Sequence, residues 1–445
     1  MKKLHCFIAC LTLTISFVNA QKLLPVGFYS GITVAQGSNH FSLKVEEGLS
    51  YRLAVLQQGI DVVLSLYDKD SSLIIEVDSP TGSFGEEEIL YKAKRSGLLQ
   101  LIISPFEDQD DYSNGYVDIW VSEMDKNTLK ARKKDQRRIK KENRSNVQTL
   151  DITHFWEAYD ELENVSTSED SIEVIQRLYI DRATEGFKQF MLVRPEMNAP
   201  NYVQALRMFP KFYASLRANT FYVFDAKKDV NFVFNRFNSV YDDFKPFSVC
   251  FAIGVLSTGG TVTNDYVLIG AELTCSTASL DLSEFTRAPF NQLLPHLTYV
   301  GDISQKIRNI VAHECVHTQQ PDDLDDSEQT CSLLHACLSE GFCDFVGEYL
   351  VGDQINASLH AYGDANEEAI WKSFSSALCN GSQEDWLYNY GRFEDKPADL
   401  GYYIGYVVAK RFFELAEDKK EAIRMLIDFR DAEEILNASK YKEKW

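Results

Sequence analysis

The stretch RNIVAHECVHTQQ, residues 308–320, carries two histidines four residues apart, and a glutamate directly follows the first. Residues four apart on an α-helix lie on the same face, so His313 and His317 can direct ring nitrogens to one point. Glu314 is rotated by about 100° from His313, which leaves it beside that point. The spacing therefore suits a metal ion held by two imidazoles, with an adjacent carboxylate that can act on a water. Apolar residues on the same segment predict that one side of this helix is buried: Ile303, Ile307, Ile310 and Val311.

A third ligand is needed, because H-E-x-x-H alone arises by chance in roughly one chain in a hundred of this composition. The extended form of the pattern requires glycine at position 320 and histidine at position 323. Gln320 and Asp323 stand there instead, which excludes that class. His335 lies on the next apolar segment, but nothing beside it supports a ligand role, and we expect an ordinary packed or surface histidine.

Glu340 is the stronger candidate for the third ligand. It lies twenty-three residues after His317, in the segment LSEGFCDFVGEYL. Asp344 follows on the same helical face, where it can accept the N–H of a ligand histidine and fix its tautomer. We therefore predict His313, His317 and Glu340 as metal ligands and Glu314 as general base, with Asp344 behind a ligand histidine.

The composition is that of a globular chain. Its 445 residues predict two or three folding units, and 45% of them are apolar. The formal net charge of −21 argues against nucleic acid or an anionic membrane surface as the main partner.

Residues 1–20, MKKLHCFIACLTLTISFVNA, have the features of a secretory signal peptide. Two lysines precede an apolar stretch, and Val-Asn-Ala offers a cleavage site after Ala20. No later segment approaches about twenty consecutive apolar residues, so we expect no transmembrane segment in the mature chain. The predicted location is the periplasm, the cell surface or the medium.

The cysteines also bear on this location. Seven of the nine follow the signal segment, all in the second half of the chain. An odd number in an oxidising compartment leaves at least one thiol unpaired. Disulfides suit such a compartment, but the sequence leaves their pairing open.

Three regions follow the signal segment. Short alternating apolar runs between residues 26 and 122 predict an all-β sandwich of about eight strands. Residues 123–150 hold the basic run KNTLKARKKDQRRIKKENR, which we interpret as a solvated interdomain linker or an exposed helix. From 151 to 445, apolar residues recur at three- and four-residue steps and predict a mainly helical domain. Two strand-like runs, 247–256 and 266–273, flank a glycine turn and make this domain α+β.

The sandwich region, 21–122, resembles the bacterial pre-peptidase C-terminal domain. The similarity lies in YRLAVLQQGIDVVLSLYD, in EEEILYKA, and in SGLLQLIISP followed by NGYVDIWV. The resemblance implies an accessory module of secreted hydrolases. Its residues offer no catalytic set, so we expect a structural or adhesive role, such as contact with a cell surface or a glycan.

H-E-x-x-H followed by E-x-x-x-D on a later helix resembles the gluzincin metallopeptidases. More narrowly, residues 151–440 resemble a family of predicted secreted bacterial zinc proteases related to a gliding-motility lipoprotein. The matching stretches are FAIGVLSTGGTVTNDYVLIGAE, VAHECVHTQQ, LSEGFCDFVGEYLVG and LGYYIGYVVAKRFFE. The resemblance implies a zincin-like metallopeptidase domain, with zinc as cofactor and a peptide or protein as substrate.

An active site of this kind implies a definite reaction. Glu314 takes a proton from a zinc-bound water as the water attacks a peptide carbonyl. One of the runs 247–256 and 266–273 is expected to be the sheet edge that holds the substrate extended. A donor to the oxyanion is expected from the C-terminal part, and the candidates are Tyr402, Tyr403 and Tyr406. Aromatic packing is an equally good interpretation of these tyrosines.

The main alternative is a non-enzymatic exported surface or envelope protein, with a zinc-stabilised helical domain and a sandwich that binds a partner. Glu314 favours the enzyme, because a purely structural zinc has no use for a base beside an open coordination position. A motility or envelope-assembly factor is a third hypothesis, based on family analogy alone. The acidic stretch PDDLDDSEQ, residues 321–329, could favour basic substrates or bind calcium, although a solvated loop is the default interpretation.

Overall fold

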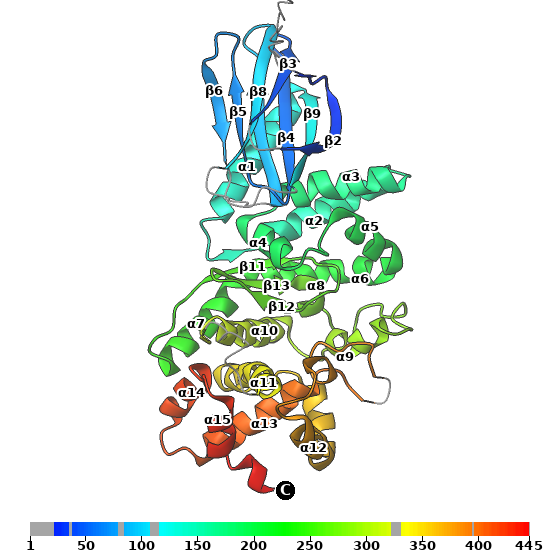
Figure 1. Ribbon diagram of the computed structural model, residues 1–445. Helices are drawn as coiled ribbons and strands as arrows, with labels where there is room; N and C mark the ends of the chain where they lie inside the picture. Colours follow the sequence, from blue (N-terminus) through cyan, green and yellow to red (C-terminus); the bar gives the residue numbers. More distant parts are fainter. Residues whose placement is uncertain are drawn as a thin grey trace, which may run out of the picture. The chain divides into compact units, whose positions relative to one another are not determined.

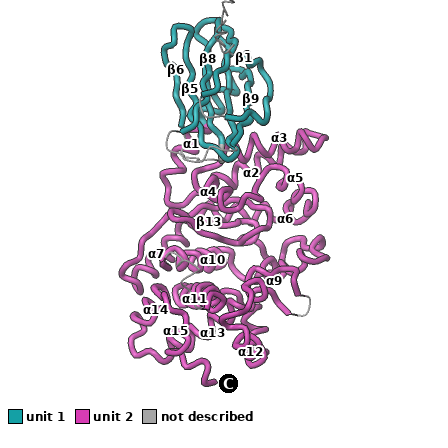
Figure 2. The backbone as a smooth tube through the Cα atoms, in the orientation of Figure 1, with its two compact units in different colours: residues 1–134 teal, residues 135–445 magenta. Residues whose placement is uncertain are grey.

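The computed structural model describes residues 22–34, 38–78, 84–106, 115–321, 331–393 and 396–444. The chain divides into two compact units, residues 1–134 and 135–445 (Figure 2). The predicted signal peptide and all of the acidic stretch except Pro321 lie outside the described residues, so the interpretations of both stay predictions. None of the described helices combines the length and the apolar character that crossing a bilayer requires.

The first unit is a sandwich of two β-sheets (Figure 1). Alternate residues of its strands point into one apolar core, as Phe41, Leu43 and Val45 do in β3. The predicted sandwich is confirmed, with strands β2 to β9 between Gly27 and Met124, two residues beyond the predicted end at 122. One sheet has the order β1 (Lys22–Leu23), β3 (Asn39–Val45), β8 (Gly97–Pro105), β5 (Val62–Tyr67), β6 (Leu73–Val77). The other has the order β2 (Gly27–Thr33), β9 (Tyr116–Met124), β4 (Ser50–Gln58), β7 (Phe84–Lys92).

The basic stretch is largely helical, since α1 spans Lys126–Glu142. The division between the units falls inside this helix, after Lys134. Residues 135–150 therefore belong to the second unit, whose sheet includes β10 (Val147–Gln148). The second unit thus starts before residue 151, where the helical periodicity of the sequence begins. The sequence did not indicate this earlier start, because a two-residue strand carries no periodic signal.

The second unit contains a four-stranded sheet with the order β10–β11–β13–β12. Strands β11 (Ser248–Ala252) and β13 (Tyr266–Gly270) are the two predicted runs, and they pair in parallel. Both are interior strands, so the prediction that one of them forms the free edge is wrong. The edge strands are β10 and β12 (Gly260–Val262), and β12 pairs antiparallel with β13. The glycine stretch that predicts a turn in the sequence thus supplies an edge strand.

Helices surround this sheet and make the unit mainly helical, as predicted (Figure 1). Helix α10 packs against β12 and β13, α4 packs against β11 and β13, and α11 packs against α10 and α13. The helices are α2 (Leu150–Glu161), α3 (Ser168–Leu178), α4 (Glu185–Val193), α5 (Ala199–Met208), α6 (Pro210–Thr220), α7 (Lys227–Val240), α8 (Ala271–Thr274), α9 (Leu294–Leu297), α10 (Ile303–His317), α11 (Ser332–Val351), α12 (Ala357–Ala377), α13 (Leu400–Leu415), α14 (Lys419–Ile427) and α15 (Ala432–Ala438).

Two glycines allow α11 and α13 to pack closely. A methyl group on Gly341 would overlap the backbone of Gly405, and one on Gly405 would overlap the carbonyl oxygen of Cys337. Any larger residue at either position would separate the helices. Because Gly341 directly follows Glu340, this contact also fixes the depth at which the Glu340 side chain lies.

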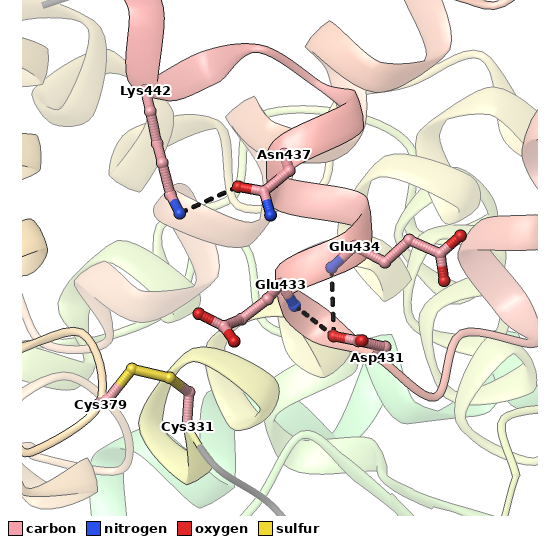
Figure 3. The surroundings of a disulfide bond; sticks show 7 residues. All are labelled: Cys331, Cys379, Asp431, Glu433, Glu434, Asn437 and Lys442. Carbon is pink, nitrogen blue, oxygen red and sulfur yellow. Dashed lines mark hydrogen bonds between the residues drawn. A yellow bond between two sulfur atoms is a disulfide. The ribbon is translucent and has the colours of Figure 1, made fainter.

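One disulfide, between Cys331 and Cys379, joins the residue before α11 to the segment after α12 (Figure 3). The remaining described cysteines are unpaired and buried, namely Cys250, Cys275, Cys315, Cys337 and Cys343. The expectation of at least one free thiol therefore holds for the described part of the chain.

A buried ion pair stabilises the first helices of the second unit. The guanidinium of Arg182 donates to both carboxylate oxygens of Asp135, over 2.6 and 2.9 Å. Arg182 also pairs with Glu157 at 2.6 Å, and His154 lies 3.4 Å from Asp135. Burial opposes ionisation of Asp135, but His154 and Arg182 outweigh it and hold the pKa of this carboxyl well below its usual range.

We expect Asp135→Asn to lower the free energy of unfolding by about 2 kcal/mol at pH 7, because Arg182 loses a buried partner. The unfolded state binds this proton more readily than the folded state, so the stabilisation is lost as pH falls. In urea titrations followed by tryptophan fluorescence, the difference between the two proteins should shrink progressively as the pH falls from about 5 to about 2. Asp160→Asn, which breaks an exposed pair with Arg217, is the control and should cost less. A difference that is independent of pH would contradict this account.

Candidate metal centre

Helix α10 places the two predicted histidine ligands and the predicted base at the centre of the second unit. It starts at Asp302, whose side chain accepts the N–H of Ser304. One side of the helix is buried against the sheet and α11, as its apolar spacing predicts. His313 and Glu314 are only 5% and 6% exposed.

The structure brings His313, His317 and Glu340 together. The Nε2 atom of His317 lies 3.1 Å from Oε2 of Glu340, and Nε2 of His313 lies 3.5 Å from the same oxygen. Glu340 comes from α11, which packs beside α10. Residues from two helices thus meet at a single carboxylate oxygen.

The other nitrogen of each histidine ring, Nδ1, already makes a hydrogen bond to a neighbouring side chain. Nδ1 of His313 lies 2.8 Å from Oδ1 of Asp344, and Nδ1 of His317 lies 2.9 Å from Oε1 of Gln320. Carboxylate and amide oxygens only accept, so each Nδ1 carries the proton. In the neutral rings both Nε2 atoms then present lone pairs toward Glu340.

Three electron-pair donors that meet without a hydrogen between them require a cation or an extra proton. Burial alone would disfavour the charged carboxylate, but His317 and His313 hold the pKa of Glu340 well below its usual range. Two neutral imidazoles and one carboxylate are a ligand set that suits zinc. The side chains present therefore fit a zinc ion.

Asp344 has the position expected of a carboxylate behind a ligand. It is fully buried and takes a second hydrogen bond, 2.8 Å long, from Nδ2 of Asn356. His360, on α12, lies 3.8 Å from the same Oδ2 oxygen. Such a contact orients the imidazole of His313 and raises its basicity toward a metal.

The thiol of Cys343 also lies near this centre. One ligand atom each from His313, His317 and Cys343 fall within 4.8 Å of one another. Burial raises the pKa of the Cys343 thiol well above its usual value, so the protonated form is favoured. Glu340 is charged and faces both Nε2 atoms, which makes it the better third ligand.

Glu314 lies beside the three converging side chains, against the edge strand. A methyl group on Gly260 of β12 would overlap the Glu314 carboxylate, so only glycine permits this approach. Burial raises the pKa of Glu314, and His313 and His317, when protonated, oppose that effect only in part. A raised pKa suits a group that must accept a proton near neutral pH.

The centre opens into a cleft of about 730 Å³. His317 and Glu340 line it, together with Val262 and Thr263 at the end of β12. His335 lines the same cleft but does not join the ligands, and its ring stacks on Phe429 at 4.8 Å. The side chains of His317 and Glu340 are therefore accessible from this cleft.

The three predicted tyrosines have different surroundings. The ring of Tyr402 stacks on His313 at a centroid distance of 6.0 Å. Tyr403 donates to Asp364 and Tyr406 donates to Glu348, at 3.0 and 2.7 Å, so their hydroxyls are committed elsewhere. Of the three, only Tyr402 contacts a ligand residue.

Tyr388 reaches the centre and was missed by the sequence analysis. Its hydroxyl donates to Oε1 of Glu340 in a short hydrogen bond. It belongs to a loop before α13 and has a left-handed backbone with φ of 53°, which is unfavourable for a tyrosine. No periodic pattern identifies a residue of this kind, because its position depends on a loop conformation.

Residues 296–437 match the sequence model of a family described as "Predicted Zn-dependent protease (DUF2268)". This range includes all the residues of the candidate centre except those of β12. No curated protein matches the chain. A solved structure, the pre-peptidase C-terminal domain of a collagenase from Bacillus anthracis, matches at 14% identity over 23% of this chain and 95% of that chain, with a TM-score of 0.19.

We expect Glu340→Gln to lower zinc affinity by more than the roughly 10- to 100-fold that follows loss of an outer-sphere partner. The substitution removes the only carboxylate among the proposed ligands. Zinc content after dialysis and competition titration with a chelating dye measure the effect. Glu348→Gln, on the same helix and also bonded to a tyrosine hydroxyl, is the matched control. Equal zinc retention by both variants would exclude Glu340 as a ligand.

Proposed function

We propose that the protein is an exported zinc-dependent metallopeptidase of gluzincin type. In this proposal His313, His317 and Glu340 hold the metal, and Glu314 is the general base. The observation that carries the proposal is the convergence of two imidazole lone pairs and a carboxylate beside a second, buried carboxylate. The match to predicted zinc-dependent proteases supports the same activity.

Zinc, when bound, supplies a Lewis acid that polarises a peptide carbonyl and makes a nearby water more acidic. Glu314 accepts the proton of that water as it attacks the carbonyl carbon. The same carboxyl then gives the proton to the amine that leaves. The absence of a side chain at Gly260 leaves room for this carboxylate beside the proposed ligands.

An extended peptide can be held by β12. This strand pairs with β13 along one edge only, and no described strand pairs with the other edge. Its last residues line the cleft beside His317. A substrate that adds to this edge through main-chain hydrogen bonds passes directly over the ligands and Glu314.

Tyr388 is the group best placed to donate to the developing oxyanion. Its hydroxyl already lies at the ligand carboxylate and lines the cleft. Tyr402 stacks on the ring of His313 and also has a side-chain hydrogen bond with Glu340, so it is the second candidate donor. A phenol donor near the reacting carbonyl stabilises negative charge that appears only in the transition state.

A surface protein with a purely structural zinc is the second candidate. The open cleft and the buried Glu314 favour the enzyme, because neither serves a closed structural site. Export and a binding role for the sandwich remain part of the proposal. N-terminal sequencing of the protein recovered from the producing cell tests cleavage after Ala20.

Glu314→Gln should lower kcat/KM for an unfolded casein substrate by at least about 100-fold, because the proton acceptor is lost. Zinc content should stay the same, since Glu314 is not a proposed ligand. Hydrolysis rates with and without a chelator, combined with metal analysis, measure both quantities. Undiminished turnover in this variant would remove Glu314 from the mechanism, and chelator-resistant turnover by the wild type would exclude a metallopeptidase.

Tyr388→Phe should lower kcat by about 100-fold through loss of one oxyanion donor. KM and zinc content should change little. Tyr390→Phe is the matched control, because this nearby tyrosine bonds to His296 and not to a ligand. If Tyr388→Phe instead releases zinc at unchanged kcat per bound metal, the hydroxyl only orients Glu340.

A further inference from the structure

The cleft extends well beyond the three proposed ligands. From Glu340 it follows α11 toward the start of that helix, where Ser339, His335 and Ser332 line it. Phe429 and Arg430, in the loop between α14 and α15, form another part of its wall. This extension offers space for substrate residues next to the scissile bond.

The charges of this cleft differ from those of the whole chain. Among the described residues that line it, Glu340 is the only carboxylate and Arg430 the only permanent cation. Glu340 faces His313, His317 and the proposed metal position, so its charge is directed away from this end of the cleft. Although the chain has a net charge of −21, the described wall of this cleft carries one permanent positive charge, that of Arg430.

Arg430 makes no ion pair with a carboxylate in the described part of the chain. The acidic residues on either side of it are engaged elsewhere. Asp428 accepts from Tyr241 at 2.6 Å and pairs with Arg424 at 3.1 Å. Asp431 caps α15 by accepting the N–H groups of Glu433 and Glu434, at 2.9 and 3.1 Å (Figure 3).

The backbone that carries Arg430 is held in place. Phe429 is buried between the ring of His335, at 4.8 Å, and the ring of Phe342, at 4.9 Å. The disulfide from Cys331 fixes the start of α11 at Ser332 (Figure 3). The guanidinium thus extends from a rigid anchor, which lowers the entropy lost when it binds a ligand.

We propose that this end of the cleft is a subsite for a carboxylate of the peptide substrate, with Arg430 as the residue that determines specificity. The carboxylate is either an acidic side chain or the C-terminus of the peptide. A guanidinium binds a carboxylate through two parallel hydrogen bonds, and the hydroxyl of Ser332 and the amide of Gln383 add donors nearby. This inference rests on the proposed peptidase function and names its substrate class.

Binding to full-length, zinc-loaded protein carrying Glu314→Gln tests the inference without hydrolysis. The probes are short, fluorescently labelled peptides that differ only in carrying glutamate, glutamine or lysine, each with a free or an amidated C-terminus. Fluorescence anisotropy at low ionic strength gives Kd. We expect the glutamate peptide, or the peptide with a free C-terminus, to bind about fivefold tighter than the amidated glutamine peptide.

Variants of Arg430 test whether this residue causes the preference for a carboxylate. Arg430→Gln should abolish it, and Arg430→Glu should reverse it in favour of lysine. Arg411→Gln, an exposed arginine on α13 that pairs with Glu414, is the control and should leave it unchanged. The free and amidated forms show whether the C-terminus or an acidic side chain is bound, and either result supports the inference.

Equal binding of all peptides, absence of binding by any of them, or a preference for lysine in the unmodified cleft would overturn the inference. So would a preference that survives Arg430→Gln. Hydrolysis by the wild type is measured separately. Cleavage without a carboxylate preference defeats only the subsite, and a carboxylate preference without cleavage defeats only the proposed peptidase activity.

Discussion

The second unit depends on the convergence of three electron-pair donors at one buried point. Nε2 of His313 and of His317 face one oxygen of Glu340, while their Nδ1 atoms are committed to Asp344 and Gln320. Repulsion between such groups is tolerated in a folded protein only if a positive charge joins them. The surrounding helices can therefore be understood as the framework that holds this arrangement in place.

Close packing of backbone sets the geometry of this framework. Gly341 and Gly405 bring α11 against α13 beside Glu340, and Gly260 brings the edge strand against Glu314. The buried carboxyl group of Glu272 accepts the N–H groups of Gly254 and Leu256 and so fixes the loop that leads to β12. The glycines allow main chain to approach closely, and the buried carboxyl group holds main chain through hydrogen bonds.

The sequence predicts those features that repeat along a single element. Helical spacing is enough to place His313 with His317, and Glu340 with Asp344, and strand alternation is enough for the sandwich. The edge position of β12 was not predictable, because three residues around a glycine turn carry no alternation and strand order depends on distant partners. Tyr388 was not predictable for a similar reason. It lies forty-eight residues after Glu340 in the sequence, and a loop in which Tyr388 itself has a left-handed backbone brings the two side chains together.

Asp344 connects three helices through one carboxylate. Asp344 lies on α11 and accepts hydrogen bonds from His313 on α10 and from Asn356 at the start of α12. His360 of α12 lies close to the same carboxylate. A metal ion that binds only the folded form stabilises that form by mass action. Binding of zinc at the proposed site would therefore raise the free energy of unfolding of this unit. With zinc held as proposed, the melting temperature of the helical unit would rise with the concentration of free zinc.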